Sequence, residues 1–336
     1  MSFTHDFAMS VMLGYGMGPG IGDVFFLVGA KASTNAYYML LNSQGVGDDH
    51  IFTDPTTAHA AMTAERNDVL IVTPAEYTLT SGVTWSKTRC HIACAGGPNL
   101  RVQPSTLTTG GLRFKTVTAA VSYLFEFSGN YCESYGLATF NNGAATSNLG
   151  DIGIIGKNNY FKKCDFRGGN NATQNTATTP YAGVPVVFEA GTNYGNGTTF
   201  EECQIGSAGN AVRTHGAGAV LFLGGGAFDT TFKNSRLEMW TETSGSDVAL
   251  VKLNAASQSA DRLMEFDGCT LYNFWTNLAS KMSYAVVDGA GTTHNISFKN
   301  CSVIGITALS NVATYTFTNI ADAGTHGGIG AAVATS

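Results

Sequence analysis

Apolar positions in the second half of the chain recur in a segment of fixed form: Phe, two polar residues, Cys, one further residue and an apolar residue. The copies begin at Phe161, Phe200, Phe232, Phe266 and Phe298, and successive copies are 39, 32, 34 and 32 residues apart. The Cys is replaced in one copy, by Ser235. A repeat of this length with variable spacing predicts a solenoid in which each copy belongs to one coil.

Within a copy, the Cys and the apolar residue two positions later can share one face of a strand, but the Phe three positions before the Cys cannot. We expect a bend at the polar pair, whose second member is Asn234, Gly268 or Asn300 in three copies, because Asn and Gly tolerate a left-handed backbone. Further apolar strands are expected at 186–188, 220–223, 248–251 and 284–287. Stacked coils would bury the Cys in one column and the Phe in another. A metal or redox site for the Cys, or a carbohydrate platform for the Phe, is the weaker alternative.

The segment before the repeats has a different pattern. Asp54 and Pro55 are suited to begin a helix, and the apolar stripe that follows predicts a capping helix over 55–66. Next come the apolar strand 68–72, the segment 73–79, and a strand at 89–93 that leads to Ala-Gly-Gly at 95–97.

This order resembles the N-terminal cap of pectate-lyase-like β-helix proteins, although Ala75 stands where that family has Gly. A similar opening occurs in phage virion proteins. The resemblance implies an all-β fold, a right-handed parallel β-helix with a short N-terminal capping helix. It leaves function open, because this fold serves lyases, hydrolases, tailspikes and inert virion parts.

These patterns divide the chain into three parts. Residues 54–310 form the β-helix, residues 1–53 an N-terminal arm or assembly region, and residues 311–336 a C-terminal strand and a Gly/Ala-rich tail. The arm contains a glycine-rich run at 14–20 flanked by Met and Phe, which is costly to order alone, so we expect it to pack on a neighbouring subunit. A disordered tail is the alternative.

Composition narrows the classes of partner. Charged residues make up 12% of the 336 residues and the formal net charge is −6, with no Lys/Arg run, which argues against nucleic acid. The apolar stretch 7–28 is interrupted by several Gly and by Pro19, so we predict neither a signal peptide nor a membrane span. The seven Cys, an odd number without metal-type pairs, are predicted to be reduced thiols.

Aligning the repeats predicts two outward rows of polar side chains. One row is Asp165, Gln204, Arg236, Thr270 and Ser302; the other is Lys162, Glu201, Lys233, Asp267 and Lys299. The second row alternates in charge, which favours a solvated charge ladder over a catalytic groove. Glu201 and Glu202 are the best candidates for a glycosidase pair, but adjacent residues at a bend point in different directions.

The seven His, at positions 5, 50, 59, 91, 215, 294 and 326, lack metal-ligand spacing. We therefore predict no catalytic, cofactor-binding or metal-binding residues, and no cofactor.

From these features we predict a non-enzymatic structural protein of a phage particle: a homotrimeric capsid decoration or spike protein, located in the virion. The expected partners are other capsid proteins, with host surface glycans as further candidates. The stretch 1–38 is expected to carry the trimer contacts. The alternative function is a tailspike-like polysaccharide depolymerase, either a lyase or a glycosidase, and a secreted pectate-lyase relative is a third.

Overall fold

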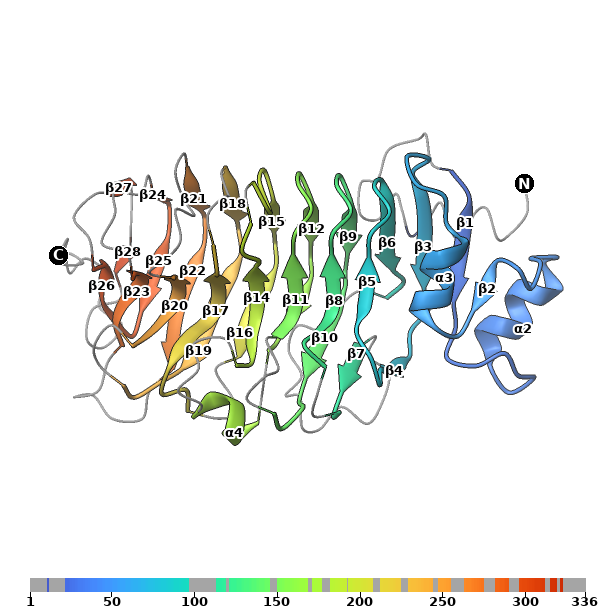
Figure 1. Ribbon diagram of the computed structural model, residues 1–336, viewed down its shortest axis with the longest axis horizontal. Coiled ribbons are helices and arrows are strands. Elements are labelled where there is room, and N and C mark those ends of the chain that lie inside the picture. Colours follow the sequence, from blue (N-terminus) through green and yellow to red (C-terminus); the bar gives the residue numbers. More distant parts are fainter. Residues whose placement is uncertain are drawn as a thin grey trace.

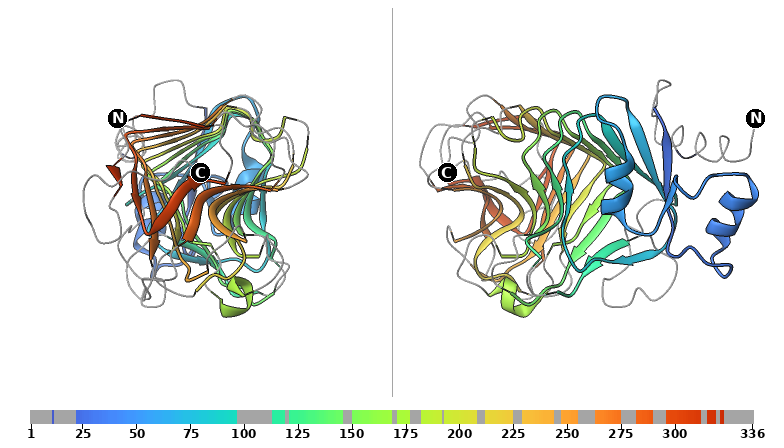
Figure 2. Two further views of the ribbon diagram at one scale, coloured as in Figure 1. Left: turned by 90° about the vertical axis from the view of Figure 1, so that its left-hand side faces the viewer. Right: turned by 45° about the vertical axis from the view of Figure 1, so that its right-hand side comes forward.

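The chain winds into a right-handed parallel β-helix, as predicted, with three sheets running along its length (Figure 1). The computed structural model describes residues 11, 22–96, 113–118, 121–145, 150–168, 171–176, 182–191, 193–207, 212–224, 229–243, 247–254, 263–274, 282–289, 296–311, 315–318 and 321–322. Looking along the stack, the three sheets surround a core filled by inward side chains (Figure 2).

From β3 to β26, each coil contributes one strand to each sheet, and the paired strands are parallel. Sheet A contains β2 (Ile51–Phe52), β1 (Val24–Leu27), β3 (Asp68–Val72), β6 (Cys90–Cys94), β9 (Glu133–Tyr135), β12 (Tyr160–Lys162), β15 (Thr199–Glu201), β18 (Thr230–Lys233), β21 (Met264–Asp267), β24 (Ile296–Lys299) and β27 (Tyr315–Thr318). Sheet B contains β4 (Glu76–Thr78), β7 (Arg113–Thr116), β10 (Ala138–Asn141), β13 (Asp165–Phe166), β16 (Gln204–Ser207), β19 (Arg236–Trp240), β22 (Thr270–Phe274), β25 (Ser302–Ile304) and β28 (Ala321–Asp322). Sheet C contains β5 (Val83–Trp85), β8 (Tyr123–Phe127), β11 (Gly150–Ile154), β14 (Val184–Phe188), β17 (Gly216–Phe222), β20 (Val248–Leu253), β23 (Met282–Asp288) and β26 (Ile306–Ser310).

The repeat produces the two predicted columns. Successive Phe rings from Phe161 to Phe298 stack with centroids 4.9–5.1 Å apart and interplanar angles of 6–11°. The four repeat Cys and Ser235 are buried, and each thiol after the first lies within 3.3 Å of a Phe carbonyl of a preceding coil. All seven Cys are buried thiols, as expected. The bends that separate the columns have a left-handed backbone in all five copies, at Lys163, Glu202, Asn234, Gly268 and Asn300.

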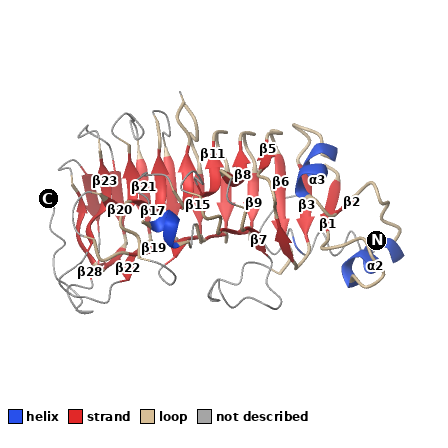
Figure 3. Ribbon diagram, turned by 60° about the horizontal axis from the view of Figure 1, so that its bottom comes forward, coloured by secondary structure: helices blue, strands red, loops and turns tan. Residues whose placement is uncertain are grey.

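The described residues contain three helices, two of them at the N-terminal end of the solenoid (Figure 3). They are α2 (Ala36–Ser43), α3 (Pro55–Ala61) and α4 (Ala172–Asn175). The cap helix α3 begins as predicted, with the Asp54 side chain accepting a hydrogen bond from the Thr57 N–H at 2.9 Å. It is shorter than the predicted 55–66, because Met62 takes an extended backbone and ends it.

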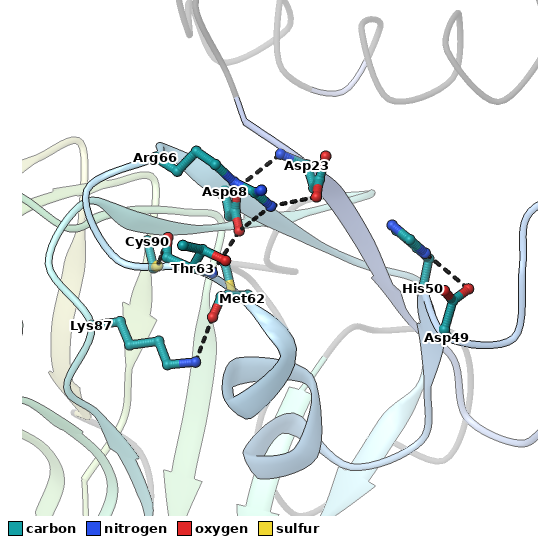
Figure 4. Close-up of polar contacts among 9 residues, drawn as sticks. All are labelled: Asp23, Asp49, His50, Met62, Thr63, Arg66, Asp68, Lys87 and Cys90. Atoms are coloured by element: carbon teal, nitrogen blue, oxygen red, sulfur yellow. Dashed lines mark hydrogen bonds and ion pairs between the residues drawn. The ribbon is translucent and has the colours of Figure 1, made fainter.

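The β-helix begins earlier in the chain than residue 54. Strand β1 pairs in parallel with β3, with Val24 opposite Val69. Below this pair, the buried carboxylate of Asp68 accepts the backbone N–H groups of Asp23 and Thr63 at 2.8 and 2.7 Å and contacts the Arg66 guanidinium (Figure 4). The sequence-based boundary at 54 therefore falls inside the solenoid, because an apolar run interpreted as exposed forms its first strand.

The structure also describes parts of both ends of the chain. Strands β27 and β28 continue sheets A and B beyond residue 310. The glycine-rich run at 14–20 and the tail after 322 lie outside the described residues; nearby, Val11 packs against the outer apolar cluster of its own chain that includes Phe26 and Ile71. Within the described residues, no helix is long and apolar enough to cross a membrane.

Candidate active site

The alternating row predicted on the outer face of sheet A is present. Lys162, Glu201, Lys233, Asp267 and Lys299 lie in register on successive strands. Lys162 Nζ lies 3.7 Å from Glu201 Oε1, and Lys299 Nζ lies 3.3 Å from Asp267 Oδ2. These partly exposed pairs form a charge ladder, as expected.

Glu201 and Glu202, the sequence-based glycosidase candidates, do not form an acid–base pair. A hydrogen bond from the Tyr160 hydroxyl at 2.8 Å, followed by the charge of Lys162, lowers the pKa of Glu201, so this carboxyl is held ionised. Glu202 sits at the left-handed bend and pairs with Lys163 at 3.6 Å. Glu201 is therefore not suited to donate a proton, and Glu202 points away from it at the bend.

The other predicted row lies on the outer face of sheet B, where it joins a larger charged network. Asp165, Gln204 and Arg236 lie in register on β13, β16 and β19. Sequence alignment of the repeats missed two members, Arg167 and Glu238. Arg167 Nε lies 2.6 Å from Asp165 Oδ1 and its Nη1 lies 3.7 Å from Glu238 Oε1, so one guanidinium lies between two buried carboxylates.

Glu238 has two further partners in this network. Gln204 Nε2 donates to Glu238 Oε1 at 2.5 Å, and Arg236 Nε lies 2.6 Å from Glu238 Oε2. The Arg236 guanidinium also lies 5.0 Å from the centre of the Tyr272 ring. Burial raises the pKa of Asp165 to about 6 despite the Arg167 charge beside it. Both carboxylates contact guanidinium groups of this chain, and these ion pairs join neighbouring coils.

A different arrangement occurs on the outer face of sheet C, on strands β8, β11 and β14, which lie side by side (Figure 1). Glu126 on β8 lies opposite Gly153 on β11, and Gly153 lies opposite Val187 on β14, two residues before Glu189. The Tyr123 ring lies across Gly153, where a Cβ would be only 2.7 Å from a ring carbon. Its hydroxyl donates a hydrogen bond to Glu189 Oε1.

Local sequence explains this geometry. In the strand Tyr-Leu-Phe-Glu-Phe at 123–127, Phe125 and Phe127 fill the core, which leaves Glu126 between them pointing outward. Glu126 projects from β8, and Glu189 follows β14, two strand spacings away and two residues farther along, so their backbones are roughly 12 Å apart. The missing side chain at Gly153 creates the gap between the two carboxyls, and the Tyr123 ring partly fills it.

A hollow of about 320 Å³ opens beside Glu126 and Tyr123. Side-chain hydroxyls dominate the rest of its wall: Thr80, Ser81, Thr84, Thr118 and Ser122. An aromatic side chain, a carboxyl and several hydroxyls around one open hollow are the groups that hydrogen-bond and pack against sugar rings.

The electrostatics of this group differ from those of the ladder and the network. Burial, followed by the charge of Glu189, raises the pKa of Glu126. Burial and the hydrogen bond to Glu189 raise the pKa of Tyr123, so its hydroxyl keeps its proton. No described cation forms an ion pair with Glu126 or Glu189. The group therefore combines a carboxyl with a raised pKa and a second carboxyl anchored by the Tyr123 hydroxyl.

Sequence reasoning missed this site because it lies outside the aligned repeats. The available signal was local: Glu126 is the one charged residue in an apolar strand, and Glu189 directly follows the apolar strand Val-Pro-Val-Val-Phe at 184–188. A period-2 pattern places the first of these outward, but their proximity depends on coil register, which the sequence before the repeats does not reveal.

Comparison with known proteins places the fold. No family model matches the sequence, and no curated protein matches it. Among solved structures, a pectin methylesterase from Aspergillus niger is 11% identical, with 94% of this chain and 92% of that chain covered and a TM-score of 0.51. A pectin methylesterase from carrot is 10% identical, covering 90% and 84% with a TM-score of 0.40. The ORF18 protein of Geobacillus virus E2 is 12% identical, covering 80% and 57% with a TM-score of 0.39.

These comparisons contradict the prediction that the chain is not an enzyme. The Aspergillus structure, which shares the fold over nearly the whole chain, is an enzyme. That prediction depended on finding no carboxyls that converge. Aligning the repeats could compare only positions within the repeats, so acids outside them were not considered. At this identity the likeness establishes the fold, so the reaction has to be argued from the side chains of this chain.

Proposed function

We propose that the protein is a polysaccharide-cleaving enzyme, a glycoside hydrolase whose active site is the group formed by Glu126, Tyr123 and Glu189 on sheet C. The observation that carries the proposal is the outward acid Glu126, whose pKa is raised and which lines the hydroxyl-rich hollow. A second acid, Glu189, is held nearby by the Tyr123 hydroxyl, and no described cation pairs with either carboxyl. Glycosidases need a protonated carboxyl to donate to the leaving oxygen and an ionised one on the other side of the bond.

The roles follow from the environments of the two groups. Glu126 is the general acid, because burial and the neighbouring charge favour its protonated form. Glu189 is the second carboxylate, and Tyr123 is its positioning residue, because its hydroxyl donates to Glu189.

The test is cleavage of polysaccharide by purified protein. A panel of bacterial capsular and exopolysaccharides is incubated with the full chain, and new reducing ends are counted. We expect cleavage of at least one polymer, its loss in Glu126→Gln and Glu189→Gln, and its retention in Glu265→Gln, an outward Glu on sheet A. Unsaturated ends would indicate a lyase, and failure to cleave any polymer, or equal cleavage by both variants, would contradict the proposal.

We further propose that this enzyme is a homotrimer carried on a virus particle, where it contacts other capsid proteins and acts on host surface glycans. The resemblance of the segment 54–97 to the opening of phage virion proteins supports this setting. So does the low charge of the surface, which suits packing side by side. Light scattering of the purified chain should give three times the monomer mass, and mass spectrometry of purified particles should detect the protein. A monomer would exclude the trimer.

A further inference from the structure

We infer that the sheet C site takes a neutral glycan and discriminates against sugars that carry a carboxylate. The inference rests on the proposed function and adds the class of substrate. It differs from the Aspergillus neighbour, a pectin methylesterase, whose name indicates pectin as its substrate.

The wall of the hollow provides hydrogen-bonding groups without positive charge. Its described polar side chains are hydroxyls of Thr, Ser and Tyr and the carboxyl of Glu126, and none of its described lining residues is Lys, Arg or His. Hydroxyls satisfy the hydroxyl groups of a neutral sugar. A sugar carboxylate needs a charge-assisted donor, for which a guanidinium is the usual choice.

This chain has such guanidinium groups on its outer surface, but they are engaged elsewhere. Arg113, Arg167 and Arg236 all lie on sheet B, each beside a carboxylate of the chain itself. On the outward row of Glu126, the described cation is Lys252, in register with Leu221 on the preceding strand. Four strand steps separate it from β8, roughly 19 Å.

The site also repels negative charge. The charge of Glu189 contributes to the raised pKa of Glu126, so a negative group near Glu126 is already disfavoured without ligand. A sugar carboxylate bound in the hollow would lie in the same negative field. Partial burial of the site keeps this repulsion from being fully screened, and we expect it to weaken binding at least about tenfold at low salt.

The experiment compares matched polymers. Neutral glucan, galactan and mannan, and any polymer found to be cleaved, are each paired with their own form in which the primary hydroxyls are oxidised to carboxylates. Binding to the inactive Glu126→Gln variant and cleavage by the unchanged chain are measured at low and high salt. We expect the neutral form of a bound polymer to bind about tenfold or more tightly at low salt, and the ratio to shrink at high salt because ions screen the repulsion.

A gain-of-function variant sharpens the test. Thr84 is exposed and lies opposite Glu126 on the neighbouring strand β5, so Thr84→Arg places a cation at the hollow, while Thr84→Gln adds length without charge. We expect Thr84→Arg to reduce the discrimination and Thr84→Gln to preserve it. Equal or tighter binding of the oxidised polymers by the unchanged site overturns the inference alone. Absence of binding and cleavage for every polymer overturns the proposed function together with it.

Discussion

Two pairs of outward carboxylates lie on neighbouring faces of this solenoid, and their surroundings are opposite. On sheet B, Asp165 and Glu238 are buried around the Arg167 guanidinium, and Arg236 flanks Glu238 as well. On sheet C, Glu126 and Glu189 have a tyrosine between them, and no described cation pairs with either. Both pairs are built from the same strand geometry, with one strand between the two acids.

The difference shows which carboxyls are free to do chemistry. Asp165 also has a raised pKa, but it is paired with Arg167, and removing one partner of such a buried ion pair is costly. A carboxyl beside a like charge is unstable when ionised, so it takes up a proton that it can then donate. Sheet B therefore joins coils, and sheet C contains the pair that we propose to be reactive.

The largest effect is expected from removing the proton donor. Glu126→Gln keeps the shape of the side chain but cannot donate a proton, so kcat for polysaccharide cleavage should fall about 1,000-fold, within the range for general acids. Stability should be unchanged or slightly higher, because repulsion with Glu189 disappears. Initial rates and urea midpoints measure both quantities, with Glu265→Gln as the control. A large loss of stability would assign Glu126 to the scaffold instead.

Removing the central cation of the sheet B network should lower stability and leave the cleavage rate unchanged. Arg167→Ala leaves Asp165 and Glu238 buried near each other without the shared guanidinium, so unfolding free energy should fall by about 3–5 kcal/mol. Rates per folded molecule should be unchanged. Arg236→Ala is the control: its half-exposed side chain should cost about 1 kcal/mol.

The pH dependence of that loss provides an internal check. The folded pKa of Asp165, about 6, lies above its unfolded value near 3.9, so its protonation favours the folded state at low pH and this contribution fades as pH rises through 6. Without Arg167 the ionised form becomes worse still. The destabilisation should therefore be larger at pH 8 than at pH 5, and a pH-independent difference would contradict the assignment.

A third comparison tests the coupling inside the sheet C pair. Glu189→Gln removes the charge that, after burial, helps to raise the pKa of Glu126, so that pKa should fall. Carboxyl chemical shifts followed by NMR titration report this directly, without relying on residual activity. An unchanged titration of Glu126 would show that burial alone sets its pKa and that the two carboxyls are too far apart to cooperate.

The fold was largely predictable from the chain, for a physical reason. Phe and Cys recur at positions that stacking brings into columns, so each coil has the same local sequence pattern. A shift in register would bury polar residues. The first strand was missed because the apolar run at 25–28 has no counterpart in the repeats; only its pairing with β3 distinguishes it from an exposed apolar segment.

The sequence predicted the outward polar rows of sheets A and B but not the acids on sheet C. The rows of sheets A and B follow from aligning the repeats, whereas Arg167 and Glu238 lie two residues farther along their strands and join through long side chains. Glu126 and Glu189 occupy different positions in their coils and approach each other because Tyr123 crosses Gly153. Such contacts depend on individual side chains and loop lengths, which vary between coils.

The smallest effect should come from the exposed ladder of sheet A, which completes the comparison. Glu201→Gln removes a carboxylate that the Tyr160 hydroxyl and Lys162 contact at the surface, and should lower unfolding free energy by no more than about 1 kcal/mol. The folded pKa of Glu201 is lowered, so its contribution is present above the unfolded pKa near 4.3 and is lost as pH falls through the folded value. The difference in urea midpoint between the variant and the unchanged chain should therefore be larger at pH 7 than at pH 3, and cleavage should be unaffected. A loss of cleavage comparable to that of Glu126→Gln would place the active site on the outer face of sheet A. It would also contradict the distinction between paired and unpaired carboxylates.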